Sequence, residues 1–196
     1  MKKFIRKIVK FVGLTALLPL LSSCNYNSLV EKQQEVDQAW AQVENQYQRR
    51  ADLIPNLVNT VKGYSTHESE TLEKVTLARA KATSITLDAN NMTEEDLARF
   101  QAAQNELSQA LKSLLAVTEA YPDLKANENF MNLQTQLEGT ENRIATERMR
   151  YTEVVRDYNT TIKKFPTTIY AGWFGFTPKP QFKAEAGAEK APEVKF

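Results

Sequence analysis

The segment Phe130–Phe165, FMNLQTQLEGTENRIATERMRYTEVVRDYNTTIKKF, decides the fold. Large apolar residues recur in it at every seventh position: Phe130, Leu137, Ile144, Tyr151, Tyr158 and Phe165. Seven residues make about two turns of an α-helix, so these side chains form one apolar stripe along a single helix. Pro166 follows and ends the helix, because the residue before a proline disfavours helical backbone. A stripe of this length has to be buried against other helices, which indicates an all-α protein.

The same spacing occurs nearer the N-terminus and predicts a second long helix over Leu29–Lys62. Its stripe consists of Trp40, Tyr47, Ile54 and Val61, flanked by Val36, Val43 and Leu57. Ser28 and Glu31 form a capping box at its start, and Gly63 is a stop signal at its end. Pro55 removes one backbone hydrogen bond inside this range, so the helix either kinks or breaks there. A kink is favoured because the stripe continues past the proline.

Two shorter helices are predicted between the long ones. Capping boxes at Ser65–Glu68 and Thr93–Asp96 begin them, and the polar run Asp88–Asn91 and Pro122 end them. Their apolar positions are Leu72, Val75, Ala78, Ala82 and Ile85 in the first, and Phe100, Leu107, Leu114 and Tyr121 in the second. Four amphipathic helices with short connections predict an antiparallel up-and-down four-helix bundle over residues 29–165, with long first and last helices.

Residues 1–23 have the pattern of a cleaved secretory signal. Five basic residues and no acidic one lie within the first ten positions. The apolar segment Phe11–Leu21 that follows is too short to cross a hydrocarbon core of about 30 Å. The segment ends on the four residues Leu21, Ser22, Ser23 and Cys24.

This tetrapeptide resembles the bacterial lipobox, at which a signal peptidase cuts before a lipid-modified cysteine. The resemblance implies a mature protein that begins at Cys24, carries palmitate or similar acyl chains there, and continues through a linker over residues 24–28. More than one acyl chain makes membrane attachment stable. An ordinary signal peptide and an uncleaved anchor are the alternatives. Asn25 is not the aspartate that retains some lipoproteins in the inner membrane, so we expect the outer membrane, facing the periplasm, in a Gram-negative cell envelope.

The composition excludes several classes of function. The leader holds five of the 25 basic residues and none of the 24 acidic ones, so residues 24–196 have a net charge of −4, which argues against nucleic-acid binding. Cys24 is the only cysteine, which excludes disulfides and cysteine-based metal or redox motifs. His67, the only histidine, lies beside Glu68 and Glu70, and we interpret these three residues as helix capping and surface charge. A zinc site needs three or four spaced ligands, so we expect neither a metal nor another cofactor.

Arg50 occupies a position of the first long helix that faces the bundle. If the two long helices are antiparallel with aligned ends, Asn27 lies opposite Lys164 and Arg50 lies opposite Glu141. We predict an ion pair that fixes the register, because a lone buried charge costs several kcal/mol. Reversing both charges should then rescue Arg50→Glu. Nothing near these residues marks a nucleophile, a phosphate loop or a metal, so neither they nor the protein are predicted to be catalytic.

The segment 166–196 changes from aromatic to polar. Its first part contains Ile169, Tyr170, Trp173, Phe174 and Phe176. Four antiparallel helices return the chain to its starting end, so these residues are expected near Cys24. There they either contact the membrane or a partner, as aromatic rings do at lipid interfaces, or fold back and plug the open end of the bundle. The plug is favoured because an apolar segment usually packs on its own bundle. Residues 184–196 form a polar run that we expect to be mobile.

A string of short motifs runs through nearly the whole mature sequence: Tyr26–Val30, Ala39–Trp40, Arg49–Val58, Val61–Tyr64, His67–Glu68, Tyr121–Leu124, Glu138–Ile144, Arg150–Tyr151, Tyr158–Asn159, Phe165–Pro166, Gly175–Phe176, Pro192 and Phe196. In order and spacing they resemble the LemA family of bacterial membrane-associated proteins. The resemblance implies an up-and-down helical bundle held at a membrane by its N-terminus. It implies no enzymatic activity and supplies no substrate.

These observations favour a non-enzymatic lipoprotein of the cell envelope that acts as a helical scaffold or adaptor for a protein partner. The alternative is a ligand-binding or enzymatic bundle that holds a small molecule or ion between the first and last helices. A further alternative is membrane remodelling by the aromatic tail. The interior discriminates between the first two, because a scaffold needs packed aromatic layers whereas a binding site needs a polar pocket with several converging carboxylates.

Overall fold

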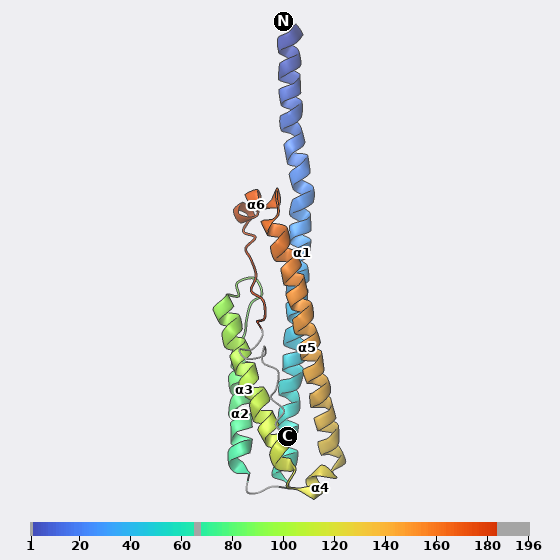
Figure 1. The fold of residues 1–196 in the computed structure, drawn as a ribbon, viewed down its shortest axis with the longest axis vertical. Coiled ribbons are helices and arrows are strands. Elements are labelled where there is room, and N and C mark those ends of the chain that lie inside the picture. The colour runs from blue at the N-terminus through green and yellow to red at the C-terminus, as the bar shows by residue number, and fades with distance from the viewer. Residues whose placement is uncertain (1, 65–67, 184–196) are drawn as a thin grey trace, which may run out of the picture.

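The computed structural model describes residues 2–64 and 68–183, with side chains from Tyr26 onward. Its helices are α1 (Lys2–Lys62), α2 (Ser69–Ser84), α3 (Glu94–Thr118), α4 (Pro122–Lys125), α5 (Glu128–Lys163), α6 (Thr167–Tyr170) and the 3-10 helix η1 (Gly172–Phe174) (Figure 1). No strand occurs in these described ranges, and the predicted all-α class is confirmed.

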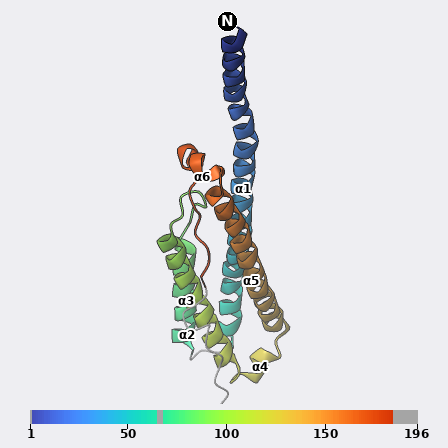
Figure 2. The ribbon, with the colours of Figure 1, turned by 45° about the horizontal axis from the view of Figure 1, so that its top comes forward.

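Two helix pairs lie side by side (Figures 1 and 2). Helices α1 and α5 form the longer pair, α2 and α3 form the shorter one, and α1 also packs on α2. Helix α4 carries the chain across the end farthest from the N-terminus. Helices α6 and η1 lie at the opposite end, beside α1, and the N-terminal part of α1 extends beyond them alone.

Side chains of the predicted stripes fill the interior in two clusters. The ring of Trp40 is central to the cluster nearer α6 and lies 5.4 Å from the ring of Tyr151 and 5.6 Å from that of Phe100. The cluster nearer α4 is mainly aliphatic and contains Ile54, Leu57, Val61, Val75, Leu107, Leu114, Leu124, Phe130 and Leu137. Trp40 facing Tyr151 is the register expected from Asn27 opposite Lys164.

Helix α1 is longer than predicted and has no break. It begins at Lys2 rather than Leu29, so the capping box expected at Ser28 lies inside the helix and that prediction is wrong. Residues 24–28, expected as a linker, are helical too. A capping residue starts a helix only where the preceding segment does not continue it, and the leucine-rich leader consists largely of residues that favour helix. Through Pro55 the helix continues, so the alternative of a break is wrong.

The ends of the shorter helices match the prediction in part. Thr93 caps α3 through reciprocal hydrogen bonds with Asp96, as predicted. Helix α2 begins only at Ser69, and Glu68 at its N-cap makes no side-chain cap bond, so the predicted capping box does not start it. Of that box, residues 65–67 lie outside the described residues. Helix α2 also ends earlier, at Ser84, because the following residues adopt extended backbone before the polar run.

Phe165 is the exception in the C-terminal stripe. The other five members are at most 4% exposed, whereas Phe165 is 81% exposed. Helix α5 ends at Lys163, so the helical spacing no longer applies two residues later. The prediction that Phe165 belongs to the core is therefore wrong.

Candidate functional site

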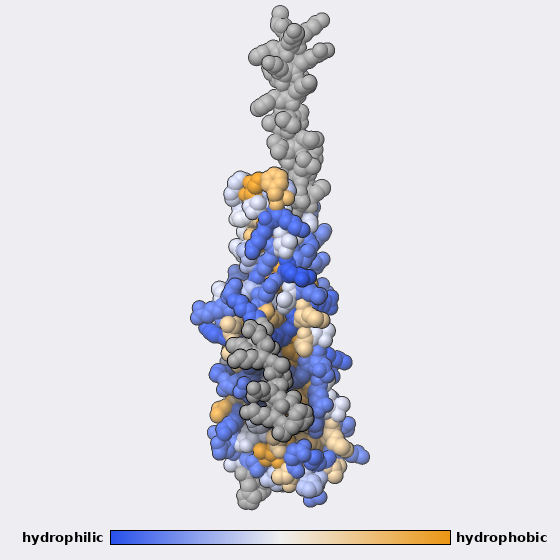
Figure 3. Space-filling model, viewed as in Figure 1, coloured by the Kyte–Doolittle hydropathy of each residue, from blue (hydrophilic) through white to orange (hydrophobic). Residues whose placement is uncertain are grey.

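An exposed apolar surface lies at the end of the molecule where α1 leaves the other helices, and Figure 3 shows hydrophobic residues gathered over α6 there. It consists of Phe165 (81% exposed), Ile169 (53%), Trp173 (81%) and Phe174 (58%), with Tyr26 (40%) beside them. We call these five residues the aromatic end. Large exposed apolar patches are typical of surfaces that contact lipid or another protein.

The chain reversal after α5 exposes these side chains. Thr167 and Ala171 are buried and hold the reversal against the helices, whereas Phe165, Ile169, Trp173 and Phe174 around them are exposed. Tyr170 is half-buried, and its ring lies 6.2 Å from the ring of Phe174. Gly175 then adopts φ 80°, a left-handed conformation that favours glycine, and turns the chain back along the bundle.

Tyr26 joins the aromatic end to α1. Its ring meets the rings of Phe174 and Phe176 edge-on, at 5.2 Å and 5.7 Å. Tyr26 follows Cys24 by two positions in the sequence. The side chain of Cys24 and those of Leu21–Ser23, the rest of the predicted lipobox, lie outside the described residues. The aromatic end is thus next to the backbone that leads to Cys24.

Beyond η1 the tail packs inside the protein. Phe176 is 7% exposed, and the ring of Phe182 stacks on that of Trp40 at 6.2 Å. The side chain of Asn159 donates to the carbonyl of Lys179 at 2.8 Å and accepts from its backbone N–H at 2.9 Å. The predicted plug therefore describes only part of the tail. Phe176 and Phe182 plug the bundle, whereas the aromatic side chains before them are exposed.

Arg50 is buried, 1% exposed, where α1, α3 and α5 meet. Its Nη1 donates to Glu141 Oε1 at 2.7 Å and to Ser108 Oγ at 2.8 Å. Its Nη2 donates to Gln104 Oε1 at 2.5 Å and to the Gln104 carbonyl at 3.3 Å. The structure brings the predicted pair together and adds two partners from α3 that the sequence did not indicate. Because of those partners, full rescue by reversing both charges is no longer expected.

The charges predicted to be ordinary helix-end residues have local partners. His67 lies outside the described residues. Glu68 accepts a hydrogen bond from the Tyr121 hydroxyl at 3.2 Å. The ammonium of Lys74 lies 2.6 Å from Glu70, and this hydrogen bond lowers the pKa of that carboxyl. Within residues 2–64 and 68–183, no three His, Cys, Asp or Glu side chains are grouped closely enough to hold a metal ion. None of the helices searched in that part of the chain has the length and apolarity to cross a membrane.

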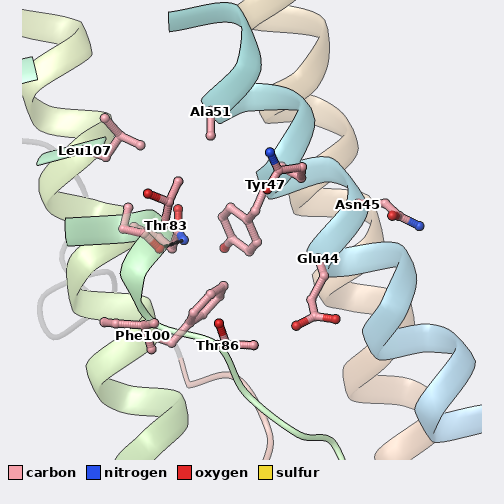
Figure 4. A pocket seen from close by; sticks show the side chains of 12 residues that line it. Glu44, Asn45, Tyr47, Ala51, Thr83, Thr86, Phe100 and Leu107 are labelled. Atoms are coloured by element: carbon pink, nitrogen blue, oxygen red, sulfur yellow. Dashed lines mark hydrogen bonds between the residues drawn. The ribbon is translucent and has the colours of Figure 1, made fainter. Parts of the chain in front are cut away.

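A cleft of about 240 Å³ opens between α1 and the α2–α3 pair (Figure 4). The rings of Tyr47 and Phe100 meet edge-on in it, at 5.1 Å. Glu44 is the one carboxylate among its described lining residues, and burial raises the pKa of this group. Tyr47 is the other ionisable side chain among these lining residues, and burial raises the pKa of its hydroxyl.

Sequence reasoning missed three residues near the aromatic end. The periodicity predicts Phe165 in the core, Tyr26 belongs only to a motif, and no pattern in the sequence indicates a role for Lys179. Lys179 is 6% exposed and donates to the Asn90 carbonyl at 2.7 Å, and burial lowers its pKa. It ties the tail to the loop between α2 and α3. The only signal in the sequence was its place between two prolines, which favour extended backbone.

Comparisons with known proteins give one matching family model and several similar proteins. The family model described as LemA family matches residues 39–196. Protein LemA of Metamycoplasma hominis is 26% identical over 147 residues, which cover 75% of this chain and 60% of that protein. Magnetosome proteins MamQ 1 and MamQ 2 of Paramagnetospirillum magneticum are each 26% identical over 181 residues, covering 84% of this chain and 66% of theirs. The chain thus spans less than two thirds of the length of these curated relatives.

Proposed function

The chain belongs to the LemA family, and from this premise we propose that it is a non-enzymatic, lipid-anchored protein of the cell envelope that acts as a scaffold or adaptor for a protein partner. In this proposal the leader 1–23 is removed and Cys24 carries the lipid. Helices α1, α2, α3 and α5 act as one up-and-down bundle displayed from the membrane, the outer membrane in a Gram-negative cell. The names of the relatives state no enzymatic activity, which supports the non-catalytic part.

The aromatic end is the observation that carries the proposal. A lipid on Cys24 would hold the membrane surface two residues from Tyr26, so the aromatic end would face the headgroups. Trp173 and Phe174 would then lie at the interface, where rings with a polar edge or an apolar face are favoured. The exposed Lys163 and Lys164 precede Phe165, and each basic residue near anionic lipid contributes about 1 kcal/mol. The bundle would stand away from the membrane, with α4 farthest from it.

Trp173→Ala is expected to weaken vesicle binding of unlipidated protein, residues 24–196 with Cys24→Ser, about tenfold. Withdrawing one ring from the interface loses roughly 1.5 kcal/mol or more of apolar transfer free energy. Co-sedimentation with vesicles that contain anionic lipid measures the partition. The side chain is 81% exposed, so its removal leaves the fold intact.

Leu77→Ala is the matched control for this measurement. Leu77 is also apolar and 62% exposed, but it lies on α2, away from the aromatic end. Its removal should leave vesicle binding unchanged. Equal losses for the two variants, or no binding by the parent protein, would contradict a lipid-facing aromatic end.

The adaptor part is tested by crosslinking in native envelopes. A photo-reactive residue replaces Leu77 on α2 or Met149 on α5, which are 62% and 61% exposed, in the full-length lipidated protein. We expect one protein to be captured in stoichiometric amount from one helix face and not from the other. Capture of no protein from either face, or equal capture of many abundant proteins from both, would overturn the adaptor role.

Ligand binding between the two long helices is the weaker function. The interface of α1 and α5 is filled by Trp40, Val43, Ile144 and Tyr151, which is the packed interior expected of a scaffold. The openings described in this structure lie between other helices. Membrane remodelling would use the same aromatic end, and no separate feature of the described residues favours it over simple attachment.

A further inference from the structure

A groove of about 630 Å³ runs between α3 and α5, two helices that make few direct contacts with each other. Leu111 and Leu115 from α3 and Leu137 from α5 contribute its apolar lining. Glu138 and Glu141 from α5 contribute carboxylates, of which Glu141 also binds Arg50, and Lys112 and Arg148 contribute basic groups. Apolar side chains beside charges of both signs fit a short segment that carries apolar, basic and acidic side chains.

The last described residues approach this groove along α5. Figure 1 shows the chain after η1 descending from α6 beside α3 and α5. Lys179 is bound to Asn159, and three residues later the ring of Phe182 lies 4.5 Å from the guanidinium of Arg148. Arg148 is also a lining residue of the groove. The tail therefore runs antiparallel to α5 and reaches one end of the groove.

Contacts between the tail and α3 also show the chain running toward the groove. The carbonyl of Lys183 accepts a hydrogen bond from the side chain of Gln101 at 3.1 Å, and its ammonium lies 2.7 Å from Glu94. Gln101 is one turn before Asn105, the first residue of α3 that lines the groove. Continued in this direction, the chain enters the groove between Asn105 and Arg148.

Residues 184–196 have the length and the side chains to fill it. Thirteen residues reach about 40 Å when extended, whereas the helix from Arg148 to Leu137 is only about 17 Å long. The segment closes with EKAPEVKF, in which Lys190 and Lys195 complement the groove's carboxylates, Glu189 and Glu193 complement its basic groups, and the last apolar residues complement the leucines. The family model extends to residue 196, so the end of the chain is part of the family pattern.

We propose that residues 184–196 bind in the α3–α5 groove of their own chain, with Val194 and Phe196 on the leucines and Lys190 and Lys195 toward Glu138 and Glu141. The tail then covers the open side of the bundle next to Arg50. This inference is independent of the proposed membrane attachment, because the groove lies away from the aromatic end. Its failure would leave that proposal untouched.

Disulfide trapping in the full-length protein tests the proposal. Cys24 is the only native cysteine, so Val194→Cys with Gln109→Cys creates a single new pair, in a Cys24→Ser background. Gln109 is exposed and lines the groove. Under mild oxidation we expect an intramolecular disulfide at least tenfold faster than for Val194→Cys with Leu77→Cys, where the second cysteine lies on α2.

Removal of the apolar anchor gives the second readout. Adding Phe196→Ser to the groove pair should reduce its rate to that of the α2 pair. Equal rates for the two pairs, or a rate indifferent to Phe196→Ser, would overturn the proposal. Disulfides that link only two molecules would assign the groove to the tail of a second copy, and would overturn binding within one chain. Far-UV circular dichroism verifies that each variant is folded.

Discussion

Arg50→Glu is expected to destabilise the bundle by at least about 3–5 kcal/mol, the cost of removing one partner of a buried ion pair. The new carboxylate would face Glu141 and the Gln104 carbonyl, two acceptors that now receive hydrogen bonds from Arg50. Repulsion would replace attraction at a position that is 1% exposed. Urea unfolding followed by circular dichroism measures the loss, which corresponds to a midpoint lower by roughly 1–3 M or more.

Arg49→Glu is the matched control. It makes the same charge reversal one residue earlier, where the side chain is exposed. A surface substitution of this kind changes the free energy of unfolding by no more than about 0.5 kcal/mol. If both reversals cost the same, the effect would come from net charge rather than from the buried site, and the role given to Arg50 would be wrong.

The double reversal Arg50→Glu with Glu141→Arg measures how much of the stabilisation by Arg50 comes from Glu141 and how much from its partners on α3. It restores the pair between α1 and α5, but Gln104 and Ser108 still present to position 50 the geometry that an arginine fits. We therefore expect the double variant to recover stability only in part. Complete recovery would mean that the contacts with α3 contribute nothing.

Predictions from the sequence were right where buried positions repeat regularly along a helix. They were wrong at helix ends, where this regularity stops. Phe130 to Tyr158 are buried at every seventh position because one straight helix presents them to the same neighbours. Phe165 keeps the spacing but lies beyond the helix, since periodicity does not report where a helix ends. The predicted start of α1 was wrong because the helix extends further than predicted. A good capping residue at Ser28 does not interrupt a preceding segment that is itself helical.

Of the contacts around Arg50, the sequence could predict only the one between the two long helices. Aligned ends alone put Arg50 opposite Glu141, because antiparallel register follows from length. Gln104 and Ser108 could not be predicted in this way. Helix α3 is shorter than α1 and α5, so several axial positions along them are possible, and no sequence pattern selects one. The reversal at Gly175 was invisible for a similar reason. A glycine shows where a left-handed turn is allowed, not which neighbouring rings it leaves outside.

Tyr26 shows why the lipid and the aromatic end should act together. A single interfacial patch binds weakly, and a tether raises its effective concentration at the surface without any new contact. With a lipid on Cys24, the patch would be held at the membrane permanently, so its contribution would be orientation rather than attachment. Trp173→Ala in the lipidated protein should therefore remain in the membrane fraction, whereas the same change releases unlipidated protein from vesicles.

Cys24→Ser is expected to abolish lipid attachment completely. Acylation of this kind joins lipid to sulfur, and the serine hydroxyl lacks the thiol's low pKa and nucleophilicity. Cells grown with an alkyne-tagged palmitate analogue should label the parent protein and give only background in the variant, which should also keep its leader and run as the larger precursor. Ser23→Ala is the control, because it keeps a small residue before the cysteine and should still be labelled and cut.

Label that persists in Cys24→Ser, or a parent protein that takes up none, would mean that residues 1–23 are an ordinary signal or an uncleaved anchor. The aromatic end would then have to supply the membrane contact that the lipid is proposed to provide.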